Sequence, residues 1–286
     1  MNALDLVTLP PLMQLTSGRP EIKIGLIDGP VAIAHPELIQ ANIQPIVSNS
    51  VTSYVQANST FQHGTLVAGV LCGQRNSIAP AICPDCTVLV RPVFTDRSRA
   101  DRTPSTTPEN LSAAILDCLA AGAQILNLSV ALEQLSSSGE SQLETALDQA
   151  ARQGTIVVAA AGNQAAIGSS AITRHPWVIP VVACDRQGHP TSYSNLGSSV
   201  GRRGLMAPGQ DITSLTGQGA ASFSGTSAAT PFVTGAIALL WSEFPKASAV
   251  AVKSAITQTG VFQRTTIIPP LLNAWEAYQS MAKVVV

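Results

Sequence analysis

Short apolar runs alternate along this chain with longer segments of helical periodicity, and this alternation limits the possible folds strongly. Between the apolar runs, Glu109–Ala121 and Gln142–Gln153 carry apolar residues at helical spacing. Apolar strands separated by helices are typical of a parallel sheet covered on both faces. The sequence therefore predicts an α/β fold with a doubly wound, mainly parallel central sheet and helices on both faces. The expected strands are Ile22–Ile27, Thr87–Phe94, Gln124–Ser129, Thr155–Ala160 and Trp177–Ala183.

The amino-acid composition excludes several classes of protein. Apolar residues make up 45% of the 286 residues, and charged residues only 12%, whereas disorder requires low hydrophobicity and high charge. The net charge of −1 gives no support for binding to nucleic acid. No apolar run approaches the ~18 residues of a membrane span, so no membrane partner is expected. The composition indicates a compact protein with much buried secondary structure.

The chain shows no internal repeat and no linker rich enough to mark a domain boundary, so a single domain over residues 1–286 is expected. The first residues lack the basic and apolar regions of a signal peptide. The expected location is therefore the cytoplasm. The oligomeric state is left open.

Five cysteines are too few and too scattered for a disulfide scaffold. Cys83 and Cys86 are spaced like metal ligands, but a zinc site usually takes four ligands and no second pair is present. Free thiols, a local disulfide and a zinc site stay open for this pair, with free thiols favoured. The polar segment Thr95–Pro108 interrupts the strand and helix pattern, and either a solvated or a substrate-contacting loop would explain it.

Three short polar segments stand where the expected strands and helices meet. Asp28 closes the first strand, His63 precedes an apolar helix, and Ser227 lies in Gly225–Pro231 ahead of a helix that runs to Trp241. In an open α/β sheet, ligands bind outside the carboxyl ends of the strands. The three side chains are therefore candidates for one site at this edge.

These residue types complement one another chemically. A serine hydroxyl becomes a good nucleophile when a neighbouring imidazole removes its proton. The imidazole in turn needs a carboxylate that holds its tautomer and stabilises its protonated form. Asn163 follows an expected strand and can donate a hydrogen bond to an oxyanion, as can the backbone N–H of Ser227 at a helix start. The sequence thus predicts Asp28, His63, Ser227 and Asn163 as catalytic residues.

The same segments resemble those of the subtilisin-like serine proteases, the subtilase family. Asp28, His63–Thr65, Ala161–Asn163 and Gly225–Pro231 match four signature segments in the family's order, and the resemblance extends from about Ile22 to Trp241. It implies a serine endopeptidase that forms an acyl-enzyme, with Asp28 orienting His63, His63 as general base, Ser227 as nucleophile and Asn163 in the oxyanion hole. A more distant likeness continues through a helix around Asn273–Tyr278.

The resemblance also implies a binding site for an extended peptide, the expected partner. One wall comprises Ser129, Val130 and Ala131, which would pair with the peptide as an added strand. The opposite wall of the S1 pocket comprises Ala160, Ala161 and Gly162. The family commonly has glycines where this chain has Ala131–Leu132, so we expect a narrower S1 pocket. The side chain preferred there is left open.

Two further features of the sequence bear on the expected cofactors and on the expected substrate. The stretch after the His63 helix is short, so the family's usual calcium loop is trimmed, and neither a metal nor another cofactor is expected. Leu26–Val31 and His35–Pro36 resemble the cyanobactin-maturation proteases, which process ribosomal precursor peptides. His63 follows Asp28 by only 35 positions, which leaves no room for the helical insertion of the macrocyclising members. The resemblance implies a protease that removes a leader peptide; the alternatives are a general intracellular protease and a catalytically dead peptide-binding protein.

Overall fold

The structure is a computed structural model that describes residues 2–46, 63–93, 105–132, 140–258 and 267–285. Most of the segment expected as a polar loop, residues 95–108, lies outside these residues. The helices are α1 Ala3–Leu6, α2 Leu9–Leu15, α3 His63–Cys72, α4 Pro108–Ala120, α5 Glu140–Gln153, α6 Ala171–Arg174, α7 Ser198–Arg203, α8 Thr226–Glu243, α9 Ala249–Gln258 and α10 Ala274–Val285. The strands are β1 Lys23–Asp28, β2 Ile43–Pro45, β3 Thr87–Pro92, β4 Ser105–Thr106, β5 Ile125–Leu128, β6 Ala131–Leu132, β7 Ile156–Ala160, β8 Val178–Cys184, β9 Leu205–Pro208, β10 Ile212–Leu215 and β11 Ala220–Phe223.

Among the described residues, seven strands form one sheet in the order β2-β3-β1-β5-β7-β8-β9. All neighbours in it are parallel. β3 lies beside β1 on one side and β5 lies beside it on the other, so the strand order reverses at β1. In a doubly wound sheet, ligands bind outside the carboxyl ends of the strands where the strand order reverses, which here is the end of β1. The predicted α/β class and doubly wound parallel sheet are confirmed.

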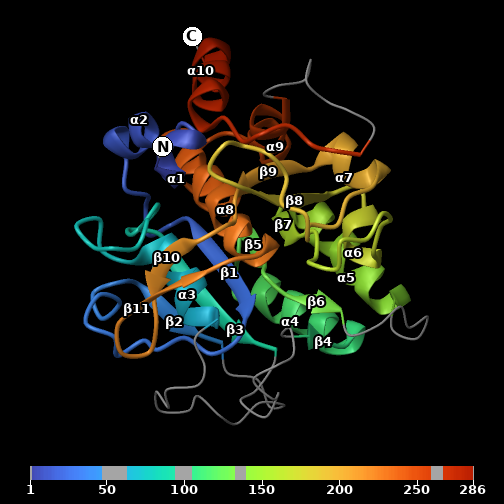
Figure 1. Ribbon diagram of the computed structural model, residues 1–286, viewed down its shortest axis with the longest axis horizontal. Helices are drawn as coiled ribbons and strands as arrows, with labels where there is room; N and C mark the ends of the chain where they lie inside the picture. Colours follow the sequence, from blue (N-terminus) through green and yellow to red (C-terminus); the bar gives the residue numbers. More distant parts are fainter. Residues whose placement is uncertain (1, 47–62, 94–104, 133–139, 259–266, 286) are drawn as a thin grey trace.

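Helices cover both faces of this sheet (Figure 1). On one face, α3 and α8 pack together, and α8 crosses β5, β7, β8 and β9. On the other face, α4 contacts β1 and β3, and α5 contacts β7. One apolar cluster lies between the sheet and the helices on each face. Successive strand residues point into opposite clusters: Ile24 and Leu26 belong to the first cluster and Ile27 to the second.

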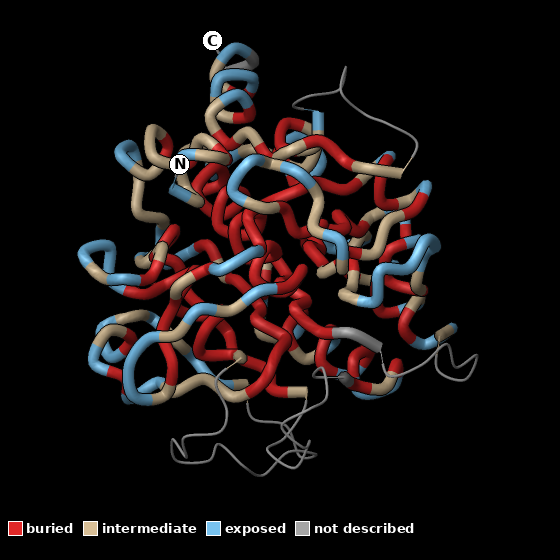
Figure 2. Tube along the Cα trace, in the orientation of Figure 1, coloured by how far each residue is buried: buried red, intermediate tan, exposed pale blue. Residues whose placement is uncertain are grey.

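The two helices of the first face explain the low content of charged residues. Gly64–Cys72 of α3 and Thr226–Ser242 of α8 are buried throughout. A helix that is apolar on all sides is typical of a buried position, as in the core of a large protein. Figure 2 shows the resulting buried centre, with exposed residues gathered at the periphery. Two central helices that begin with candidate site residues are therefore held rigidly in the core.

The two ends of the described chain pack against each other. α2 contacts α10, the hydroxyl of Thr8 donates to Asn273 Oδ1 at 2.6 Å, and the backbone N–H of Trp275 donates to Thr8 Oγ1 at 3.1 Å. Figure 1 shows both ends on the same side of the molecule. In the described parts of the chain, no helix combines the length and the apolar character that crossing a bilayer requires.

Candidate functional site

Asp28, His63 and Ser227 come together at the carboxyl edge of the sheet. Asp28 is the last residue of β1, His63 the first of α3 and Ser227 the second of α8. His63 Nδ1 lies 2.7 Å from Asp28 Oδ1, and His63 Nε2 lies 2.9 Å from Ser227 Oγ. A carboxylate only accepts hydrogen bonds, so Nδ1 carries the proton of the neutral ring and Nε2 accepts from the serine hydroxyl. The three predicted residues thus form one continuous hydrogen-bonded array.

The start of α3 is fitted tightly against the turn that follows β1. A Cβ atom on Gly64 would lie 2.3 Å from Gly29 O and 2.6 Å from Pro30 O, so only glycine allows this approach. The hydroxyl of Thr65 accepts a hydrogen bond of 2.9 Å from the N–H of Ala32. These contacts set the distance between Asp28 and His63.

Replacing Gly64 with alanine tests this packing. The added methyl group meets backbone oxygens that have little room to move, so α3 must shift away from β1 and lengthen the bond from His63 to Asp28. A misplacement of about 1 Å can cost about 10²-fold in rate, and we expect a loss of about that size in kcat/KM. Gly217→Ala, at a glycine with nothing within 4 Å of an added Cβ, is the control and should keep the wild-type rate.

The carboxylate of Asp28 is fully buried. Its Oδ1 accepts from the N–H of Gly29 at 2.6 Å as well as from His63, whereas its Oδ2 has no hydrogen-bond partner among the described residues. A buried negative charge with few partners favours a positive charge beside it. Burial lowers the pKa of His63, but the charge of Asp28 and its hydrogen bond raise it, and the net pKa lies above the usual 6.5.

A chain of hydrogen bonds ties the start of α8 to strand β5. Pro231 lies inside α8 and has no N–H, so the carbonyl of Ser227 lacks its usual helical donor. The hydroxyl of Ser129 donates to that carbonyl instead, at 3.3 Å. Asn127 Nδ2 donates to Ser129 Oγ at 2.7 Å, and the hydroxyl of Thr234 donates to Asn127 Oδ1 at 2.8 Å. The backbone around Ser227 is therefore held by the core of the sheet.

Asn163 lies in the loop after β7 and faces the same spot. Its Oδ1 accepts from the N–H of Thr226 at 2.9 Å and from the Thr226 hydroxyl at 3.0 Å. Two donors on the oxygen fix the orientation of the amide, so Nδ2 is left to donate elsewhere. A Cβ built on Gly225 would lie 3.1 Å from Asn163 Nδ2 and 3.3 Å from Ser227 Oγ, so both atoms border one small space. The role of Thr226 is not apparent from the sequence, where it is one residue of a small-residue run.

The predicted peptide-binding residues lie at or directly after the carboxyl ends of β5 and β7. Ser129 and Val130 are buried just beyond β5, and Ala160 ends the neighbouring strand β7, followed by Ala161 and Gly162. The backbone of β6, which begins at Ala131, pairs along one of its two edges with β4 in parallel. The two expected walls of the peptide site thus continue from two adjacent strands of the sheet, β5 and β7.

The cysteines and the acidic residues form no metal centre in the described residues. No three His, Cys, Asp or Glu side chains there are grouped to hold an ion. All five cysteines are buried free thiols, including Cys83 and Cys86.

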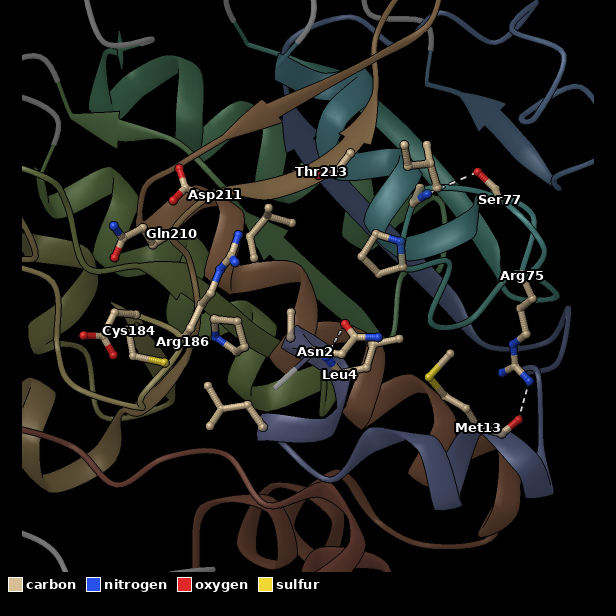
Figure 3. Close-up of a pocket in the computed structure, with 18 residues that line it drawn as sticks. Asn2, Leu4, Met13, Arg75, Ser77, Cys184, Arg186, Gln210, Asp211 and Thr213 are labelled. Atoms are coloured by element: carbon tan, nitrogen blue, oxygen red, sulfur yellow. Dashed lines mark hydrogen bonds between the residues drawn. The ribbon is translucent and has the colours of Figure 1, made fainter.

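A cavity of about 510 Å³ lies apart from Asp28, His63 and Ser227. It opens between the N-terminal helices, the loop after α3 and the segment after β9, and Figure 3 shows Asn2, Leu4, Arg186 and Asp211 around it. Its walls contain none of the predicted site residues. This cavity therefore lies outside the candidate functional site.

Comparisons with known proteins agree with this geometry. The thermostable alkaline protease of Halalkalibacterium halodurans is 31% identical over 242 residues, which are 84% of this chain and 62% of that protein. Subtilisin amylosacchariticus of Bacillus subtilis subsp. amylosacchariticus is 30% identical over 84% of this chain and 61% of its own length. The chain thus spans a little over three fifths of the length of these relatives.

Solved structures are similar over nearly the whole chain. The prenylagaramide maturation protease PagA has a TM-score of 0.81 and 31% identity, with 95% of this chain and 98% of that chain covered. The patellamide maturation protease PatA has a TM-score of 0.77 and 30% identity, with 93% and 98% covered. The family description that matches residues 19–270 is "Subtilase family", Peptidase S8. With this match over most of its length and the site geometry above, the chain belongs to the subtilase family.

Proposed function

We propose that this chain is a serine endopeptidase that cleaves an extended peptide through an acyl-enzyme. The observation that carries the proposal is the array from Asp28 Oδ1 through His63 to Ser227 Oγ, with contacts of 2.7 and 2.9 Å. Ser227 Oγ attacks the peptide carbonyl while His63 Nε2 takes its proton. Both contacts are within the range of true hydrogen bonds, so no rearrangement is needed before proton transfer.

The remaining steps use groups already beside the serine. Asn163 Nδ2 and the N–H of Ser227 donate to the oxyanion, and the second donor lies in the first turn of α8, where amides lack a helical acceptor. His63 then gives its proton to the leaving amine, and the carbon–nitrogen bond breaks. Water attacks the acyl-enzyme with His63 again as base, which releases the acid product and restores Ser227.

The substrate that we propose is a ribosomal precursor peptide, from which the enzyme removes the leader in the cytoplasm. Support comes from the likeness to two structures described as maturation proteases and from the short separation of Asp28 and His63. The peptide would lie between Ser129–Ala131 and Ala160–Gly162, which continue two adjacent strands. The sequence has Ala131–Leu132 where the family commonly has glycines, and we propose on that ground a narrow pocket for the residue before the cut.

Mass-spectrometric mapping of cut sites tests this proposal. The purified chain is incubated with a precursor peptide and, separately, with a mixture of unfolded unrelated proteins. We expect a single cut between leader and core and little cleavage of the mixture. Frequent cuts in the mixture would instead identify a general protease. Binding of the peptide without any cut would contradict the proposed activity altogether.

The pH dependence of hydrolysis follows from the raised pKa of His63. Only the neutral ring accepts the serine proton, so kcat/KM must fall as the pH drops through this pKa. Because the charge of Asp28 holds the pKa above 6.5, the acid limb of the profile should be centred above pH 6.5. A limb centred clearly below that value in the wild-type enzyme would contradict the account of the His63 pKa, in which Asp28 outweighs burial.

A further inference from the structure

The loop that presents Asn163 is exposed and conformationally strained. Its residues from Gln164 to Gly168 are exposed, and two residues within two positions of Asn163 have positive φ angles, Gly162 with 105° and Ala165 with 54°. A residue with a side chain adopts this conformation only when its surroundings impose it. Some other part of the chain must therefore hold the loop in place.

The side chain of Asn195 provides this support. Its Oδ1 accepts hydrogen bonds of 3.0 Å from the N–H groups of both Gln164 and Ala166. Its Nδ2 donates to Ala161 O at 3.2 Å and to Gln164 Oε1 at 2.7 Å. These four bonds use the two donors and two lone pairs of the amide completely. They attach to the backbone on both sides of Asn163.

The backbone around Asn195 adds further bonds to the same loop. The N–H of Asn195 donates to Gly162 O at 2.9 Å. A Cβ on Gly162 would lie 2.3 Å from Asn195 Nδ2, so the amide packs directly on the residue before Asn163. The loop and the segment around Asn195 form one unit.

We propose that Asn195 is a positioning residue for catalysis, which fixes the backbone of Asn163 so that Asn163 Nδ2 points at the developing oxyanion. The inference rests on the proposed function and on the role of Asn163 in it. The side chain of Asn195 bonds to the loop that carries Asn163. Thr226 fixes the amide end of Asn163, and Asn195 fixes the backbone from which that side chain extends.

The expected effect falls on kcat and not on KM. The oxyanion exists only in the transition state and the tetrahedral intermediate, so a misplaced donor leaves binding of the substrate unchanged. Removing an oxyanion donor costs about 10² to 10³ in kcat, and we expect that for Asn163→Ala. A displaced donor retains part of its effect, so Asn195→Ala should cost about 10-fold in kcat, with KM within about twofold of the wild type.

A double-mutant cycle on hydrolysis of one peptide substrate tests the proposal. Asn195→Ala should lower kcat in the wild-type background and should have no further effect in the Asn163→Ala background, because no amide is left to position. Losses that multiply in the double variant would overturn the inference while leaving the proposed protease intact. A wild-type enzyme that hydrolyses no peptide would overturn the proposed function, and the inference with it.

Two further variants separate positioning from folding. Asn195→Asp keeps the oxygen that accepts from Gln164 and Ala166, so it should recover part of the lost kcat, and it carries the cycle if the alanine variant does not fold. Asn42→Ala is the matched control: its Nδ2 donates to Thr87 Oγ1 at 2.6 Å, at the amino end of the sheet. It should keep the wild-type kcat; a loss equal to that of Asn195→Ala would overturn the proposal.

Discussion

Replacing Ser227 with alanine is expected to reduce kcat by about 10⁶-fold, the size of loss that removal of the nucleophile causes in subtilisin. The hydroxyl is the group that forms the acyl-enzyme, and His63 has no proton to accept without it. The substitution removes one oxygen at the start of α8, where the backbone is held by Ser129 through the Ser227 carbonyl. The fold should therefore persist, and KM or peptide affinity should change little.

A matched serine on the same helix provides the control. The Ser242 hydroxyl donates to Ala238 O at 2.7 Å near the other end of α8, so Ser242→Ala removes a buried hydroxyl without touching the site. We expect wild-type turnover from it. Turnover by Ser227→Ala within about tenfold of the wild type would contradict the role of this serine as nucleophile. Loss of a true nucleophile lowers kcat by far more than tenfold.

Replacing Asp28 with asparagine should reduce kcat by about 10⁴-fold, as the same change does in other serine proteases. The neutral amide no longer stabilises the protonated ring of His63. The two influences that raise the pKa of His63 both come from Asp28, and burial alone would lower it. The acid limb of the pH profile should therefore move to lower pH while the maximum rate falls. Steady-state kinetics across pH measures both effects.

Asp117→Asn is the control for this change of charge. Asp117 accepts from Arg91 Nε at 2.8 Å, in an ion pair whose carboxylate is partly exposed. Loss of the Asp117 charge should leave both kcat and the acid limb of the pH profile unchanged. If the acid limb of Asp28→Asn stayed at the wild-type pH, the account of the His63 pKa would be wrong. Thermal unfolding of each variant shows whether it remains folded.

The sequence predicted that Asp28, His63 and Ser227 would lie together, and the structure brings them within hydrogen-bond distance, because local signals place each of them at the end of a strand or the start of a helix. Asp28 ends an apolar strand and Ser227 begins an apolar helix, and parallel strands bring such ends to one edge. The strand ends were less accurate: the strand expected over Thr87–Phe94 ends at Pro92, and that over Gln124–Ser129 covers Ile125–Leu128. Where a strand ends depends on its neighbours, which local periodicity does not contain.

Other features give no clear local signal in the sequence, or depend on contacts between distant segments. Leu9–Leu15 is helical despite two prolines, which are tolerated because they lie in the first turn. The pairing of Ala131 with Ser105 joins short segments with no strand pattern of their own. Asn195 gave no signal, since its importance comes from the loop more than 25 residues earlier that it contacts.

The central claim is that His63 activates Ser227 as a nucleophile in this chain. Labelling with a fluorophosphonate tests it most directly, because an activated serine displaces fluoride and forms a stable bond to phosphorus. Peptide mapping by mass spectrometry should locate one adduct on Ser227, and His63→Ala should abolish labelling without unfolding the protein. An unlabelled Ser227 in the wild-type protein, or equal labelling without His63, would contradict the claim.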